Sequence, residues 1–171
     1  DAGRINEILS FHSSLPPEER LNSPKLCFGM EIQKTSDTVL KKLTEGEALV
    51  FGLLTDSHYV VNGTWGDTLA NISAVNDRVG FDGLIHLGDL QDGMLDKKMC
   101  RRIATKCISD MRHICEPLYM TIGNHDTNYF KGNTEWLTEA EQYGLYGRFM
   151  DNYVCREKQN GWYYVDYSKH G

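Results

Sequence analysis

Apolar runs that end abruptly in polar side chains place the strongest constraint on how this chain can fold. The first run, residues 49–58 (LVFGLLTDSH), carries no charge until Asp56 and His58 at its end. A run of this kind is typical of a strand that is buried on both faces, as in a parallel sheet covered by helices. In such sheets ligands bind beyond the carboxyl ends of the strands, so we expect Asp56 and His58 to lie at a binding site.

Two further runs, residues 82–89 (DGLIHLGD) and 118–126 (LYMTIGNHD), deliver polar groups in the same way, each after a glycine. If the three runs are neighbouring parallel strands, the residues that follow them converge on one edge of the sheet. This convergence would bring together carboxylate, imidazole and amide groups from Asp56, His58, Asp89, Asn124, His125 and Asp126.

Helical patterns separate the three runs. Asp67 or Thr68 is expected to cap a helix with an apolar stripe, and Gly80 is expected to end it. A second helix is expected from about Gly93 to Glu116, because apolar residues repeat at helical spacing and a proline follows. The order strand, helix, strand, helix, strand predicts an α/β fold with a βαβαβ core.

Residues 1–47 have a different character, with three of the four prolines and no cluster of potential ligands. We expect them to form an extension that precedes a domain of residues 48–171. One short helix is expected before Pro16 and another from near Ser36, both packed on the outside of the sheet.

The part of the chain beyond the third run also shows local signals. Thr138 and Glu141 have the spacing of a capping box, which predicts a helix that continues to about Phe149. Residues 153–157 and 162–167 are expected to pair as a hairpin, because a turn with Asn and Gly separates them.

Composition limits the classes of function. The 171 residues suffice for one domain with a sizeable core, and a net charge of −6 argues against a partner of duplex nucleic acid. No apolar run approaches the roughly 20 residues of a membrane span. The five cysteines lack Cys-x-x-Cys spacing, which favours a reducing, cytoplasmic compartment. Cysteines on the apolar stripe of the second helix are expected to be buried packing residues.

The convergent donors indicate a metal site. Carboxylate, imidazole and amide oxygen suit divalent ions such as Mn, Fe, Zn or Ni, and the lack of thiolates argues against structural zinc. Asp89 comes from the middle run and can bridge two ions. With Asp56 and His58 on one side and Asn124 on the other, it would hold them about 3.5 to 4 Å apart, the spacing used for displacement at phosphorus.

The motifs TDSH (55–58), GD (88–89) and GNHD (123–126), in this order and at these separations, resemble the first three signature blocks of the calcineurin-like metallophosphoesterase superfamily. The resemblance covers about residues 48–167. It implies a four-layer α/β/β/α sandwich of which this chain supplies the βαβαβ half. It also implies a hydrolase that acts on a phosphomonoester or phosphodiester, as a phosphatase or a phosphodiesterase.

The resemblance implies a role for each residue. It implies that the four metal ligands named above form a binuclear centre with Asp89 as the bridge, and that a metal-bridging hydroxide attacks phosphorus. His125 would protonate the leaving oxygen or steady the phosphoryl group, and Asp126 would orient His125. The substrate would be a small phosphoester or a nucleotide.

The chain departs from the family pattern downstream. Family members carry a lone histidine and then a Gly-His-x-His block that complete both metal shells, and this sequence has neither. Residues 48–171 therefore resemble the amino-terminal half of a catalytic domain, and a further segment or a partner chain would supply the rest. The 171 residues alone are expected to lack some ligands; His170 is a weak candidate as a replacement.

Other polar and aromatic residues near the motifs have ordinary structural explanations. Asp92 could support the site, but its place before the second helix favours an N-cap. His86 is expected to be a hydrogen-bonded core histidine and His113 to lie at the helix C-terminus. For three aromatic residues that follow the motifs, a substrate mouth and ordinary packing stay open as alternatives: Tyr59, Trp65 and Tyr129.

Two other functions fit the sequence less well than a hydrolase does. A non-catalytic protein of the same fold could use this surface as a binding or scaffold module, but such proteins tend to lose metal ligands. A dinucleotide-binding domain is disfavoured because no Gly-x-Gly-x-x-Gly follows the first run.

Overall fold

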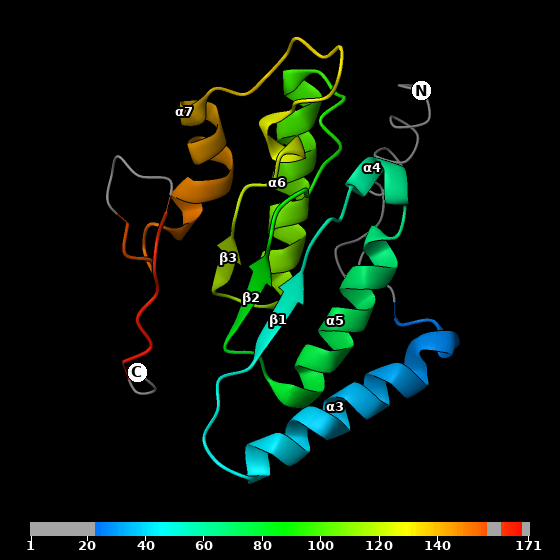
Figure 1. The fold of residues 1–171 in the computed structure, drawn as a ribbon. Helices are drawn as coiled ribbons and strands as arrows, with labels where there is room; N and C mark the ends of the chain where they lie inside the picture. Colours follow the sequence, from blue (N-terminus) through cyan, green and yellow to red (C-terminus); the bar gives the residue numbers. More distant parts are fainter. Residues whose placement is uncertain (1–22, 157–161, 169–171) are drawn as a thin grey trace.

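The computed structural model describes residues 23–156 and 162–168, and a three-stranded parallel sheet lies at its centre. The strands are β1 (Phe51–Leu54), β2 (Gly83–His86) and β3 (Leu118–Met120), paired in the order β1-β2-β3. Figure 1 shows that all three point toward the same end of the molecule. The predicted α/β fold with a βαβαβ core is confirmed.

Helices connect the strands and pack on one another. A short helix α4 (Tyr59–Asn62) and a longer helix α5 (Trp65–Val79) join β1 to β2, and α6 (Lys97–Ile114) joins β2 to β3. α5 ends at Gly80, whose φ of 74° lies in the region that glycine tolerates. In the described parts of the chain, no helix has both the length and the apolar character needed to cross a membrane.

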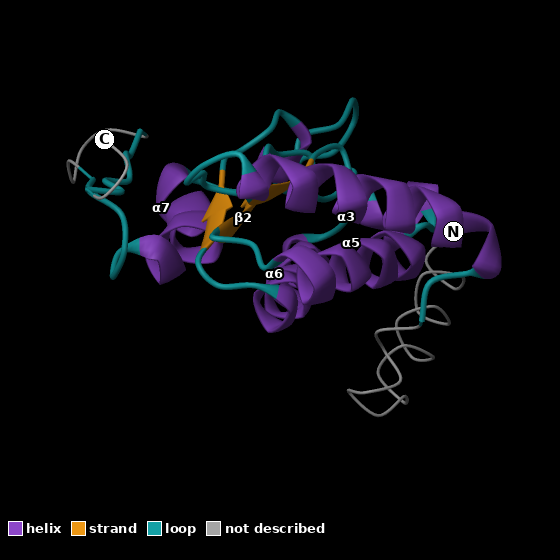
Figure 2. Cartoon of the chain, turned by 90° about the horizontal axis from the view of Figure 1, so that it is seen from below, coloured by secondary structure: helices purple, strands orange, loops and turns teal. Residues whose placement is uncertain are grey.

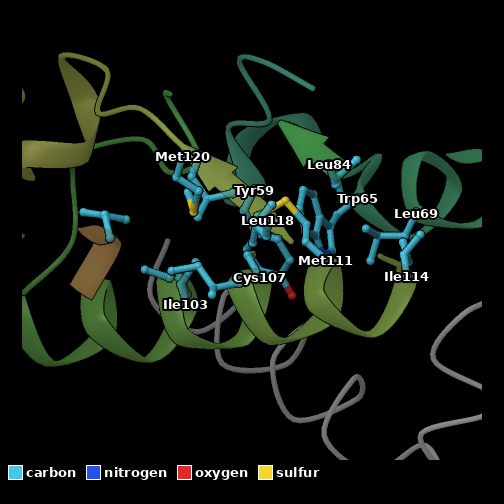
Figure 3. Close-up of a cluster of buried hydrophobic side chains, with 14 of the residues drawn as sticks. Tyr59, Trp65, Leu69, Leu84, Ile103, Cys107, Met111, Ile114, Leu118 and Met120 are labelled. Atoms are coloured by element: carbon cyan, nitrogen blue, oxygen red, sulfur yellow. The ribbon is translucent and has the colours of Figure 1, made fainter. Parts of the chain in front are cut away.

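The core lies between α6 and the sheet. Figure 3 shows Ile103, Cys107 and Met111 of α6 directed toward Leu84 of β2 and Leu118 of β3. All five side chains are fully buried. The cysteines on the stripe of α6 are therefore packing residues, as predicted, and burial raises the pKa of the Cys100 thiol to about 11.

The starts of two helices differ from the prediction. α5 begins at Trp65, before the expected caps, with Thr64 as its N-cap residue. α6 begins at Lys97 because the carboxylate of Asp96 accepts a hydrogen bond from the Met99 amide at 2.8 Å. The prediction of an N-cap at Asp92 was therefore wrong, and Asp92 lies in the loop before the helix.

The helix expected from near Ser36 begins earlier, as α3 (Gly29–Thr44) after a short 3-10 turn, η1 (Leu26–Phe28). It packs on α5, as Figure 2 shows, and Arg78 of α5 binds Gln33 and Asp37 of α3. Gln33 lies before the predicted start, so the sequence pattern missed a turn of the helix that contacts α5. The short helix expected before Pro16 lies outside the described residues.

The segment after β3 follows the predicted pattern in part. Thr138 and Glu141 form the expected capping box at the start of α7 (Glu139–Gln142). The helical path continues as a π-helical turn, η3 (Tyr143–Gly147), and a 3-10 turn, η4 (Arg148–Met150). The antiparallel pairing expected for the hairpin is present as one bridge between Cys155 and Tyr164, and its turn lies outside the described residues.

The first strand is not buried on both faces, contrary to the prediction. Leu54 packs against the core cluster, whereas Leu53 is 57% exposed. Successive side chains of a strand point to opposite faces, so the helices cover only the face of β1 that carries Leu54. On the other face, Phe51 packs edge-on against Tyr119 and Tyr167.

Asp96→Ala tests the observed start of α6. Loss of the cap leaves the Met99 amide without its partner, so the free energy of unfolding should fall by about 1 kcal/mol. Chemical denaturation of the two proteins measures the difference. Asp77→Ala, at an exposed position in α5, is the matched control and should not lower stability; an unchanged Asp96→Ala protein would contradict the assignment.

Candidate metal centre

The loops that carry the predicted ligands are held in register by hydrogen bonds that continue beyond the strands. The amide of Asp56 donates to the Gly88 carbonyl, and the amide of His58 donates to the Asp89 carbonyl, both at 3.1 Å. The ladder between β1 and β2 thus extends through both motifs. As a result, Asp56, His58 and Asp89 are fixed by backbone contacts beside the carboxyl ends of the strands.

Two glycines let the loops after β2 and β3 touch. Gly88 has a φ of 100°, and a Cβ atom there would overlap the backbone of Gly123. A Cβ atom on Gly123 would in turn overlap the side chain and amide of Asp89. The glycines of the GD and GNHD motifs are therefore required for close approach, which brings Asp89 next to the third motif.

Three of the predicted ligands have backbones in the left-handed region. The φ angles are 49° for Asp56, 39° for His58 and 54° for Asp89, and among described non-glycine residues only Asn128 shares this feature. Such conformations cost free energy and persist where the surrounding structure imposes them. Their concentration at one edge of the sheet marks this edge as a candidate functional site.

Asp126 is fully buried and joins two loops. Its carboxylate accepts hydrogen bonds from the amides of Asp89 at 2.8 Å, Leu90 at 2.9 Å and Gly123 at 2.9 Å. Burial raises the pKa of Asp126 to about 6, and the three amide hydrogen bonds oppose this shift. These partners differ from the expected one, because Asp126 was expected to orient the ring of His125.

The ring of His125 is held by Asp92 instead. Nδ1 of His125 lies 3.1 Å from the carbonyl oxygen of Asp92, and Nδ1 of His58 lies 3.4 Å from its carboxylate. If both Nδ1 atoms carry protons, as these acceptors favour, both Nε2 atoms are left free to bind a ligand. Asp92 is almost fully buried and also accepts from the Val60 amide, so its position is fixed.

The structure brings His58, Asp89 and His125 together. Each offers one ligand atom, and these atoms lie within 4.8 Å of one another. Oδ1 of Asp89 also accepts a hydrogen bond of 2.9 Å from the His125 amide, which holds the carboxylate beside the third motif. Two imidazoles and a carboxylate suit Zn, Fe, Ni or Mn, so the donors fit a divalent ion.

The two other predicted ligands, Asp56 and Asn124, are exposed. Asp56 is exposed, and its Oδ1 is 3.9 Å from Nε2 of His58. The exposed Asn124 immediately precedes the 3-10 turn η2 (His125–Thr127). Asp56 therefore lies beside His58, and Asn124 is the chain neighbour of His125.

The histidine within β2 is part of the core. His86 is fully buried, with its ring nitrogens bonded to Ser57 and the Gly88 amide, and burial lowers its pKa to about 4. It is the core histidine that was predicted.

His113 lies in the last turn of α6, as expected, and His170 is outside the described residues. Tyr59 and Trp65 are buried and pack together, which settles their role as packing.

Asp92 is the residue that the sequence interpretation misplaced. Its spacing from Asp89 is compatible with a supporting role, and α6 begins at Lys97, later than the sequence pattern predicts. Asp96 offers an equally good cap, and a helix that begins there releases Asp92 to contact the histidines. The presence of a second possible N-cap at Asp96 is the sequence signal that could have identified the role of Asp92.

Comparison with known proteins agrees with the geometry. The family model for calcineurin-like phosphoesterase matches residues 49–170. The chain therefore belongs to the calcineurin-like phosphoesterase family, whose members are generally metal-dependent hydrolases of phosphoesters. Neither the curated proteins nor the solved structures gave a match to this chain.

Asp92→Asn tests the support that the Asp92 carboxylate gives to His58. An amide in this place presents a donor toward Nδ1 of His58, which disfavours the tautomer that leaves Nε2 free. Loss of such an outer partner typically weakens metal binding about 10- to 100-fold. Competition with a chromogenic chelator measures the affinity, and Asp96→Asn in the same loop is the control. Equal affinity of the Asp92→Asn and unmodified proteins would contradict this role.

Proposed function

We propose that the chain contributes to a two-metal site that hydrolyses a phosphomonoester or phosphodiester. The observation that carries the proposal is the convergence of His58, Asp89 and His125 at the carboxyl end of a parallel sheet in a member of this family. In this proposal residues 48–171 belong to the catalytic domain and residues 1–47 form an extension.

The proposed roles follow the loops. Asp56 and His58 bind the first ion, Asp89 bridges, and Asn124 binds the second. Divalent ions bound there would supply positive charge to the phosphoryl oxygens and lower the pKa of a water that attacks phosphorus. The bridge is supported by the position of Asp89, which the His125 amide holds between the first and third loops.

His125 is proposed as the acid for the leaving oxygen. The Asp92 carbonyl accepts from Nδ1 on one edge of the ring, so the other edge, with Nε2, is left for the substrate. In this role the ring is protonated at both nitrogens and gives its Nε2 proton to the leaving oxygen. Asp126 is proposed to act as a positioning residue, because its three amide contacts fix the loop on which His125 lies. The geometry also allows His125 to be a metal ligand, and the second experiment below separates these roles.

Asp89→Asn in the full gene product tests the bridge. The amide oxygen can still accept from the His125 amide, so the fold should be kept while the bridging charge is lost. Metal content and hydrolysis of p-nitrophenyl phosphate and bis(p-nitrophenyl) phosphate should fall together. Both should fall by more than about 10- to 100-fold, which is the usual effect of losing a residue that only supports a metal ligand. Unchanged occupancy of two metals per chain would exclude Asp89 as the bridge.

His125→Ala tests the acid. Turnover should fall by about 10²- to 10⁴-fold while the bound metal per chain stays constant. Elemental analysis and rate measurements on the same samples give both values, with His113→Ala as a control outside the site. Loss of metal would instead make His125 a ligand. Full metal loading without hydrolysis in the unmodified protein would favour a non-catalytic binding protein.

A further inference from the structure

Aromatic side chains next to the metal centre have no role in the proposed chemistry. They belong to residues 128–137, called the aromatic loop below, which follows η2 and leads toward α7. Three of its side chains are largely exposed: Tyr129 at 51%, Phe130 at 42% and Trp136 at 54%. Figure 1 shows this loop in yellow at the end of the molecule toward which the strands point. Exposed aromatic groups gathered in one place often mark a binding site.

Many hydrogen bonds hold the aromatic loop in place. The side chain of Asn128 is fully buried and donates to the carbonyls of Leu95 at 2.7 Å and Glu135 at 2.8 Å. The side chain of Asn133 donates to the carbonyls of Gly93 at 2.8 Å and Asn128 at 2.9 Å. The exposed rings therefore sit on a backbone that is fixed from within, and their exposure is a property of the folded loop.

The aromatic loop borders the metal centre directly. The ring centroid of Phe130 lies 6.2 Å from that of His125, with an angle of 30° between the planes. Tyr129 and Trp136 pack edge to face, with centroids 5.5 Å apart. Gly93 lies between Tyr129 and His125. A Cβ atom at this position would overlap the Tyr129 carbonyl and lie 3.3 Å from Nδ1 of His125. Phe130 is therefore an aromatic side chain of this loop that lies directly beside His125.

We propose that the aromatic loop is a platform for an aromatic ring of the substrate, so that the preferred phosphoester carries an aryl or nucleobase group. Phe130 offers the face on which the ring stacks, and the pair of Tyr129 and Trp136 extends the apolar surface. A flat ring matches this surface better than an alkyl or sugar group, because aromatic pairs gain stacking energy beyond burial. This inference rests on the proposed function, because the phosphoryl group must be anchored at the metal centre.

Binding of phosphonates to the metal-loaded full gene product tests the platform without requiring turnover. Phenylphosphonate and methylphosphonate share the anchoring group and differ only in the ring. Calorimetry should show that phenylphosphonate binds about tenfold more tightly. Phe130→Ala should remove this preference and leave the affinity for methylphosphonate unchanged. Phe130→Leu, which keeps an apolar side chain without the ring, should remove most of it.

The control is Trp162→Ala, an exposed aromatic residue outside the aromatic loop, which should keep the preference. Adenosine 5′-monophosphate and ribose 5-phosphate form a second pair that differs only in a nucleobase. A gain for both ring-bearing ligands supports a nucleoside substrate, and a gain for phenylphosphonate alone supports an aryl ester. Equal binding of the two phosphonates, or a preference that Phe130→Ala leaves intact, overturns the platform and leaves the proposed function standing. If neither phosphonate binds, both proposals fail.

Discussion

The carboxylate of Asp126 accepts hydrogen bonds from three backbone amides in two loops, and the arrangement of the candidate metal centre depends on this contact. Removing an ionised carboxylate from water is costly, and three amide donors offset that cost. In return the loop after β2 is tied to the loop after β3. Together with the hydrogen bond from the His125 amide to Oδ1 of Asp89, this tie holds the two loops beside each other.

The loops after β1 and β2 concentrate unfavourable backbone conformations at this edge of the sheet. Asp56, His58 and Asp89 adopt positive φ angles, which the parallel ladder and the contact between Gly88 and Gly123 impose. The buried stripe of α6 packs against β2 and β3, and the free energy of this packing offsets the cost of the positive φ angles. Stability and site geometry are therefore coupled: the apolar layer of the fold holds the polar edge in a conformation that the isolated loops would not keep.

Asp92 and the aromatic loop extend this organisation outward from the proposed ligands. Asp92 contacts the Nδ1 atoms of both histidines, so one residue sets the orientation of two imidazoles. Asn128 and Asn133 then fix the aromatic loop against residues 93–95, next to His125. The candidate metal centre, its supporting groups and the proposed ring platform are thus joined by contacts between side chains and neighbouring loops.

The sequence alone determined the parallel sheet and the convergence of the three motifs, because buried strands, helix stripes and glycines leave local patterns that depend on few neighbours. The capping box at Thr138 and the buried cysteines of α6 were predictable for the same reason. Three features could not be predicted: the hydrogen-bond partners of Asp126, the position of Asp92 and the exposure of Leu53. Each depends on which distant backbone groups or layers a side chain meets. Tertiary structure alone decided that Tyr59 is buried and that Tyr129 is exposed, since both residues follow a motif and only packing distinguishes them.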